Sequence, residues 1–233
     1  MIDGVIFDKD GTLFDFRRSW GGWAAALLGE LARDAGHAAA LGQAIGYDLD
    51  TGIFGPDSPV IAGTADEVAD DLLPHLPGVL RVSLIGRMNA LAEVAPMAEV
   101  VPLAPTLGAL RARGLRLGVA TNDAEAPAHA HLAAHGIGHL FDFVAGADSG
   151  HGAKPAPGML LAFAARLALP PARVVMVGDS RHDLMAGRAA GMRTVAVLTG
   201  IAGAADLAPL ADVVLPDIGA LEAWIVAQGP SVA

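Results

Sequence analysis

The side chains best suited to chemistry lie near the start of the chain, where VIFDKDGTLF places Asp8 and Asp10 on either side of a lysine. Acidic residues spaced this way and followed by glycine open a calcium-binding loop, but they could also be the nucleophile and proton-transfer group of a phosphoryl-transfer enzyme. A calcium loop starting at Asp8 needs glycine at its sixth position and glutamate at its twelfth, and the sequence has Leu13 and Ser19 there. The apolar run before Asp8 also indicates a buried strand. The pattern therefore favours phosphoryl transfer.

Polar side chains follow three further apolar segments, at 115–120, 141–145 and 174–177. The residues are, in chain order, Thr121 and Asn122, then Lys154, and then Asp179 and Asp183. A hydroxyl and adjacent backbone N–H groups can hold phosphate oxygens. Because the carboxyl ends of parallel strands meet at one edge of a sheet, these groups are expected to converge with the Asp-x-Asp pair. An Asp-x-Asp pair alone would be read as a solvated turn; four sets of polar groups at four strand ends favour a common site.

Lysine is used sparingly in this chain. Of 15 basic residues, only Lys9 and Lys154 are lysine, and both lie in candidate motifs. A compact ammonium group suits Lys154 for neutralising charge between a carboxylate and a phosphate. We expect Lys9 to point away from the site.

Elements of two kinds alternate after Pro102. Helices are expected over 106–113, then one that ends at His135 before Gly136, one over 158–168 and one that ends near Gly191. Strands are expected at 115–120, 141–145, 174–177, 194–197 and 213–215. Such alternation predicts an α/β fold, a doubly wound parallel sheet with helices on both faces.

The segment from Ser19 to Ala95 has a different, helical pattern. Trp20, Trp23 and Leu27 recur at three-to-four spacing, and Thr64 to Glu67 forms a capping-box pattern; no strong strand is expected there. We therefore predict an all-helical cap over residues 17–96, inserted into a phosphotransfer core of residues 1–16 and 97–233. Such an insert would cover the carboxyl edge of the sheet.

Composition limits the partners and the chemistry. The chain has 233 residues, a net charge of -10, no cysteine and a mean hydropathy of +0.48. The charge disfavours nucleic acid as a partner, and Pro, Gly or a charge interrupts each apolar stretch before it could span a membrane. Without cysteine or a recognisable leader, a cytoplasmic location is the default expectation. Oligomeric state is left open.

The motifs FDKDGT, TND, AKP and GDSRHD resemble, in this order, the four motifs of the haloacid dehalogenase-like superfamily. The resemblance covers about residues 2 to 220. It is closest to the phosphoglycolate phosphatase-like branch, which has a helical cap on a Rossmann-like core.

This resemblance implies a role for each motif residue. Asp8 would be the nucleophile that becomes an aspartyl-phosphate, and Asp10 the general acid and base. Thr121, with Asn122 beside it, would bind the phosphoryl group, and Lys154 would neutralise charge. Mg²⁺ would be held by Asp8, the backbone carbonyl of Asp10, and Asp179, with Asp183 supporting them.

The implied function is a Mg²⁺-dependent phosphatase for a small phosphorylated metabolite, with phosphoglycolate as one candidate. A dehalogenase does not need Asp10, so its presence favours phosphate chemistry. Arg17 and Arg18 could reach a substrate anion from the cap hinge, or form a solvated pair. A sugar phosphomutase on the same core is the alternative, and a non-catalytic signalling receiver is disfavoured by the large insert. His131 and His135 are expected to be surface histidines.

Overall fold

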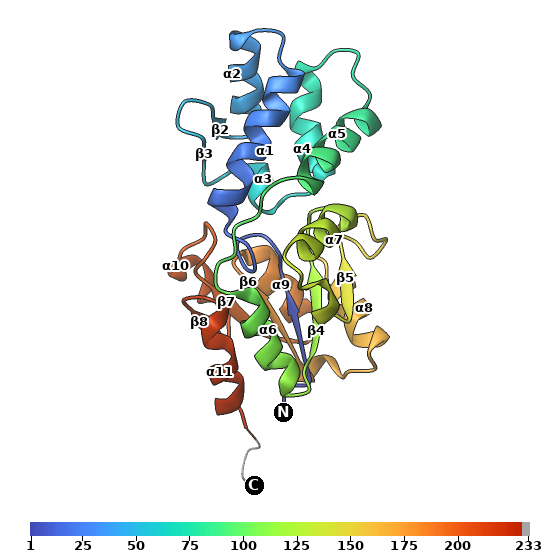
Figure 1. The fold of residues 1–233 in the computed structure, drawn as a ribbon, viewed down its shortest axis with the longest axis vertical. Helices are drawn as coiled ribbons and strands as arrows, with labels where there is room; N and C mark the ends of the chain where they lie inside the picture. The colour runs from blue at the N-terminus through green and yellow to red at the C-terminus, as the bar shows by residue number, and fades with distance from the viewer. Residues whose placement is uncertain (230–233) are drawn as a thin grey trace.

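The computed structural model describes residues 1–229, which form an α/β core with a helical cap above it (Figure 1). The core contains one six-stranded sheet in the order β5-β4-β1-β6-β7-β8, and every neighbouring pair is parallel. Its strands are β1 (Gly4–Phe7), β4 (Arg116–Ala120), β5 (Phe143–Ala145), β6 (Val174–Gly178), β7 (Arg193–Val197) and β8 (Val213–Leu215). The doubly wound parallel sheet predicted from the sequence is confirmed.

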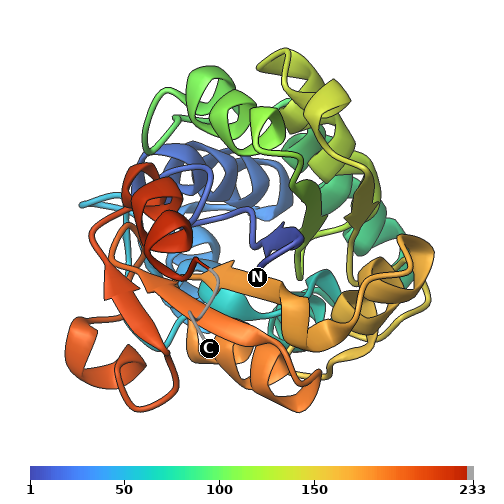
Figure 2. The same cartoon turned by 90° about the horizontal axis from the view of Figure 1, so that it is seen from below.

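Helices cover both faces of the sheet (Figure 2). One face carries α6 (Leu103–Ala112), α7 (Glu125–Ala134) and α11 (Leu221–Ala227), and the other carries α8 (Gly158–Arg166), α9 (Arg181–Ala189) and α10 (Ala204–Leu207). Side chains of a strand alternate between faces, so Val5 and Phe7 pack under α6 while Ile6 packs under α8. The sheet is therefore buried on both sides, as its continuous apolar strands require.

The cap has its own cluster of buried side chains, separate from those of the core. Its elements are α1 (Phe16–Leu31), α2 (Ala35–Ala44), β2 (Tyr47–Asp48), β3 (Ile53–Phe54), α3 (Pro59–Ala62), α4 (Ala65–Leu72), the short turn η1 (Leu73–His75) and α5 (Arg81–Glu93). The antiparallel pair β2–β3 is an addition to the expected helices, and each of its strands is two residues long. The capping box opening α4 is present, with Thr64 and Glu67 bonded reciprocally.

Two core elements differ at their boundaries from the sequence prediction. Helix α6 begins at Leu103, three residues before the expected start, because Pro105 lies in the first turn, where no backbone N–H is needed. Strand β5 begins at Phe143 because a 3₁₀ turn, η2 (Gly138–Leu140), precedes it. Two more such turns are η3 (Pro171–Arg173) and η4 (Ile218–Ala220).

The order of the strands determines where a site can form. The chain builds β1, β4 and β5 toward one edge and then β6, β7 and β8 toward the other, so β1 and β6 are neighbours where the winding reverses. Ligands of such sheets bind in the crevice at the carboxyl ends of the strands at this point. Asp8 follows β1 and Asp179 follows β6, so both lie at the crevice. Within the described residues, no helix is both long enough and apolar enough to cross a membrane.

Candidate active site

Asp8 is held at the floor of the crevice by the sheet and by a lysine. Its backbone N–H donates to the carbonyl of Val177 on the neighbouring strand, at 2.8 Å. The Lys154 ammonium donates to Oδ1 of Asp8 at 2.5 Å and to Oδ1 of Asp183 at 2.7 Å. All three side chains are buried. Lys154 therefore contacts one carboxylate oxygen of Asp8 and leaves the other free of this lysine.

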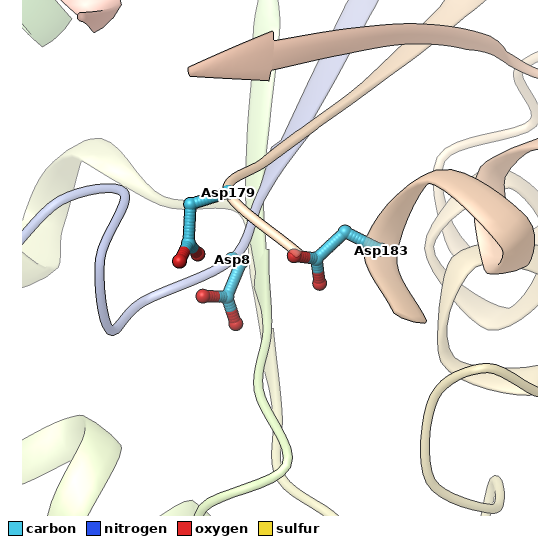
Figure 3. A group of neighbouring side chains, drawn as sticks. All are labelled: Asp8, Asp179 and Asp183. Carbon is cyan, nitrogen blue, oxygen red and sulfur yellow. The ribbon is translucent and has the colours of Figure 1, made fainter. Parts of the chain in front are cut away.

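Three carboxylates from separate segments meet at this point (Figure 3). Asp8 comes from the end of β1, Asp179 from the end of β6 and Asp183 from the first turn of α9, and one oxygen of each lies within 4.8 Å of the others. Asp183 also completes a capping box with Ser180, whose backbone N–H donates to its Oδ2 at 3.0 Å. The same side chain thus begins α9 and faces the site.

The backbone approaches Asp179 closely on two sides. Gly11 has a φ of 81°, and a Cβ there would lie 2.4 Å from Oδ2 of Asp179. A Cβ on Gly200 would lie 1.7 Å from the same oxygen. Any side chain at either position would collide with the carboxylate, so both glycines are needed for the observed geometry.

Burial and mutual repulsion raise the pKa values of two of these carboxylates, Asp8 and Asp179. Burial raises the pKa of Asp8 to about 7, with Asp183 and Asp10 adding to the effect and Lys154 opposing it. Burial, together with Asp8 and Asp183, raises the pKa of Asp179 well above its usual range. For Lys154, burial opposes the charged form, but Asp183 and Asp8 outweigh it and raise the pKa. Three carboxylates beside one ammonium leave excess negative charge, and a set of hard oxygen donors fits a divalent cation such as Mg²⁺.

Asp10 lies beside a second lysine and a tryptophan of the cap. Lys9 Nζ lies 2.7 Å from Oδ2 of Asp10, and Nε1 of Trp20 donates to Oδ1 at 2.8 Å. The Lys9 ammonium also lies 5.2 Å from the centre of the Trp20 ring, within range of a cation–π interaction. The expectation that Lys9 points away from the site is therefore wrong, because its side chain is fully buried against Asp10.

Two more groups complete the surroundings of Lys9. Asp123 Oδ2 lies 3.1 Å from its Nζ, and Nδ1 of His131 lies at 3.1 Å. His131 is 1% exposed, so the expectation of a surface histidine is wrong for it. Its Nε2 lies 2.7 Å from the carbonyl of Ala92 in α5, and because a carbonyl can only accept, Nε2 carries the proton and Nδ1 accepts from Lys9. His135, on the same helix, contacts Glu99 instead.

Thr121 and Asn122 follow β4 and line the site, but their polar atoms are used differently. The Thr121 hydroxyl accepts from the N–H of Asp123 at 3.1 Å. The Asn122 side chain accepts from the N–H of Lys154 at 2.8 Å and donates to its carbonyl at 2.9 Å. It also donates to the carbonyl of Ala62 in the cap, at 2.8 Å. Asn122 therefore fixes the backbone of Lys154 and connects it to the cap.

A cavity of about 650 Å³, partly continuous with solvent, lies between the cap and this floor. The floor includes Asp8, Asp10, Thr121 and Lys154. Arg17 and Arg18 are exposed and are not among the residues lining it, because α1 turns Phe16, Trp20 and Trp23 inward and both arginines outward. The expectation that these arginines reach the substrate has no support in this geometry. The helical periodicity of α1 could have assigned them to the exposed face.

The site on this doubly wound sheet thus combines a buried carboxylate, a lysine bound to it and a second carboxylate two residues further on. Residues 2–191 match the family model of the haloacid dehalogenase-like hydrolases, so the chain belongs to that family.

Two curated relatives place the chain within the family. It is 31% identical over 207 residues to "Probable phosphatase IndB" of Dickeya dadantii (strain 3937), covering 84% of this chain and 81% of that protein. It is 41% identical over 98 residues to phosphoglycolate phosphatase of Escherichia coli (strain K12), covering 42% of this chain and 39% of that protein. The match to the second relative is thus confined to about two fifths of its length. Both relatives are named as phosphatases, and the first is matched over most of its length.

Solved structures share the fold over nearly the whole chain. The structure of CbbY from Rhodobacter sphaeroides in complex with phosphate aligns with a TM-score of 0.72 at 22% identity, over 95% of this chain and 96% of that one. A β-phosphoglucomutase structure from Clostridium difficile aligns with a TM-score of 0.68 at 19% identity, over 98% of this chain and 96% of that one. At such identities the likeness concerns the fold alone.

Proposed function

We propose that the protein is a Mg²⁺-dependent phosphatase that hydrolyses a small phosphorylated metabolite through an aspartyl-phosphate on Asp8. The observation that carries this proposal is the contact of Lys154 with both Asp8 and Asp183 at the end of β1, with Asp10 two residues further on. Phosphoglycolate is the reference substrate because the E. coli relative is named for it.

The first step transfers the phosphoryl group to the enzyme. The free oxygen of Asp8 attacks phosphorus, the bond from phosphorus to the alcohol oxygen breaks, and Asp10 gives its proton to the departing oxygen. Lys154 offsets the repulsion between the carboxylate and the phosphate anion, and Thr121 with the adjacent N–H groups binds the phosphoryl oxygens.

The second step regenerates the enzyme. Asp10, now a carboxylate, removes a proton from water, and the water oxygen attacks phosphorus and displaces the Asp8 carboxylate. Inorganic phosphate leaves, and Asp10 is protonated again. The two proton transfers are thus assigned to one side chain, which the contacts with Lys9 and Trp20 hold beside the cavity.

The residues that would hold the cation are Asp8, Asp179 and Asp183, with the backbone carbonyl of Asp10 completing the protein ligands. A bound Mg²⁺ would neutralise charge between the nucleophile and the phosphate. The excess of buried carboxylates over ammonium groups supports this assignment.

The test measures phosphate release from a set of phosphorylated metabolites and 4-nitrophenyl phosphate, with Mg²⁺ and with excess chelator. We expect release that depends on Mg²⁺, is lost on chelation and is not supported by Ca²⁺, which accepts more ligands and would bind both oxygens of Asp8. Asp8→Asn should abolish turnover and the phosphorylated adduct seen by mass spectrometry. Full activity in chelator, or an adduct on another residue, would contradict the proposal.

The alternative function is a sugar phosphomutase, since a β-phosphoglucomutase shares this fold. A mutase keeps the phosphoryl group for a second hydroxyl of the sugar. Incubation with a phosphosugar followed by separation of products distinguishes the two: we expect free sugar and phosphate, whereas an isomerised phosphosugar would indicate the mutase.

A further inference from the structure

The wall of the cavity that faces the catalytic floor is apolar. It is built by α1, α3, α4 and α5 of the cap, and its larger side chains are Trp20, Trp23, Val60, Ile61, Val68 and Met88. Trp20 also contacts Asp10, the proposed proton donor to the leaving alcohol, so the body of that alcohol must lie against this wall.

The two tryptophans present carbon to the cavity, because the protein itself uses both of their N–H groups. Nε1 of Trp20 donates to Asp10, and Nε1 of Trp23 donates to the carbonyl of Met88 at 3.0 Å. The rings pack edge to face with centroids 5.2 Å apart, which fixes their orientation. Neither ring has a donor left for a substrate.

The polar groups of the cap wall carry no charge. Thr64 lines the cavity, but its hydroxyl is used in the capping box with Glu67. Asn89 also lines it and, among residues 1–229, its amide has no side-chain hydrogen bond. One neutral amide can bond to a hydroxyl, a carbonyl or a carboxylate on the substrate, but it supplies no positive charge to balance a second anion.

The charges at the floor are arranged against a second anion. Among the described residues lining the cavity, Lys154 is the one lysine or arginine, and its ammonium already contacts Asp8 and Asp183. The imidazole of His182, next to Asp183 in α9, is the other basic side chain that lines the described cavity. Asp10 and Asp123 also line the cavity and share the single ammonium of Lys9. A carboxylate on the alcohol would lose its water against the apolar wall and face these acidic groups unpaired.

We propose that the substrate is a phosphate monoester of an uncharged alcohol with a largely apolar, ring-sized body, and that esters carrying a second anion, phosphoglycolate included, are poor substrates. This inference rests on the proposed phosphatase function of the same site.

The test compares three esters with nearly equal leaving groups: benzyl phosphate, 4-carbamoylbenzyl phosphate and 4-carboxybenzyl phosphate. The last two have the same shape and differ in charge. We expect kcat/KM for the carbamoyl ester to exceed that for the carboxyl ester by about 10-fold or more, a typical selectivity for one contact in a pocket. Phosphoglycolate should also be a poorer substrate than benzyl phosphate.

Two arginine variants test the role of the wall. Ile61→Arg places a cation in the cavity and should raise the carboxyl-to-carbamoyl ratio of kcat/KM, whereas Val82→Arg adds the same charge at a side chain that is 75% exposed on α5 and should leave the ratio unchanged. Thermal unfolding checks that both variants fold.

The outcomes separate this inference from the function on which it rests. Equal kcat/KM for the carboxyl and carbamoyl esters, faster turnover of phosphoglycolate than of benzyl phosphate, or turnover of 4-nitrophenyl phosphate but no benzyl ester would overturn the inference and leave the phosphatase intact. No phosphate release from any ester in the presence of Mg²⁺ would overturn the phosphatase function, and the inference with it.

Discussion

Lys9 is a fully buried cation whose three ammonium protons face three acceptors: Asp10, Asp123 and His131. Burial opposes its charge, but Asp10 and Asp123 outweigh that effect and raise the pKa of Lys9. Removing one partner of a buried pair typically costs about 3–5 kcal/mol, because the other charge is left uncompensated. We interpret Lys9 as a positioning residue that holds the Asp10 carboxylate beside the cavity.

We predict that Lys9→Met affects the two classes of substrate differently. A poor leaving group needs the proton of a well-placed Asp10, so its turnover should fall by about 10²-fold. An activated aryl phosphate needs no proton, so a burst of aryl alcohol should persist, followed by slow turnover. Stopped-flow absorbance measures the burst. Loss of folded protein alone would lower the burst amplitude as much as the turnover of the poor leaving group, so a burst reduced to the same degree as that turnover would contradict the positioning role.

His131 should make stability depend on pH. Burial and the neighbouring Lys9 lower the pKa of His131 to about 4, with Asp10 opposing and His135 adding to the effect. Between about pH 6.5 and 4 the unfolded chain therefore binds a proton at this histidine that the folded chain does not, so the contribution of His131 to stability falls as the pH falls through this range. The loss amounts to at most about 3 kcal/mol. The raised pKa of Asp8 contributes with the opposite sign, because there the folded chain binds the extra proton.

His131→Gln should remove the contribution of His131 to the pH dependence of stability, because an amide can make the same two contacts without titrating. Urea denaturation at pH 4.5 and 7.5 measures the difference. His129→Gln is the matched control, on the same helix with a side chain that is 58% exposed, and should keep the parent slope. A parent slope in His131→Gln would exclude this histidine as the cause.

The sequence could predict where some of these side chains lie, but not the surroundings of others. Asp8, Thr121, Lys154 and Asp179 were expected to converge because each follows an apolar strand, and the structure brings them together at the carboxyl edge. Their catalytic roles stay predictions. The environment of Lys9 could not be predicted, since its partner His131 lies 122 positions away and a buried ion pair leaves no local pattern.

The turn between β1 and α1 determines how closely the carboxylates proposed to bind Mg²⁺ can approach the backbone. Gly11 occupies this turn with a φ of 81°, a conformation that disfavours side chains, and lies against Asp179. Thr199 Oγ1 donates to the carbonyl of Gly11 at 2.6 Å and fixes the turn from the other side. The turn therefore has little freedom to move away from Asp179 if a side chain is added at Gly11.

We predict that Gly11→Ala lowers activity strongly and weakens Mg²⁺ binding, because the methyl group displaces Asp179. Calorimetric titration with Mg²⁺ measures the affinity, and phosphate release measures the activity. Gly22→Ala is the matched control: it lies in α1, exposed, with no atom within 4 Å of an added Cβ. It should stabilise the protein by about 0.5–1 kcal/mol and leave activity unchanged. Parent Mg²⁺ affinity in Gly11→Ala would contradict the argument.

At the level of elements, the alternating pattern predicted the sheet and its flanking helices, while the boundaries moved by a few residues. Helix α6 extends to Leu103 because prolines are tolerated in a first turn, and β5 is shortened by the 3₁₀ turn before it. The β2–β3 pair of the cap escaped prediction because two residues per strand give no alternation to detect.

Apart from the bonds of Ser19 to Asp15 and Ala98 at the hinge, three hydrogen bonds of the described residues join the cap to the core at the site or at a residue next to it. Trp20 donates to Asp10, Asn122 donates to the carbonyl of Ala62, and His131 donates to the carbonyl of Ala92. These bonds are few compared with the buried clusters within each part, so the cap can separate from the core without unfolding either. Separation would break all three bonds and release Asp10 from Trp20.

We predict that the cap opens and closes as a lid over the catalytic floor. Water must be excluded while the phosphoryl group moves to Asp8 and admitted afterwards, and a hinged cap satisfies both needs. The chain has no cysteine, so Val82→Cys in the cap and Leu161→Cys in α8 can be labelled as a unique pair. Pulsed electron resonance should show a broad distribution of distances in free protein and a narrow one with Mg²⁺ and a phosphate mimic such as vanadate.

The control pair, Leu161→Cys with Val226→Cys, lies entirely in the core and should give the same distribution in both states. Identical distributions for the cap–core pair with and without the mimic would show that the cap does not act as a lid, and substrate would then have to enter through the part of the cavity that is continuous with solvent in this arrangement.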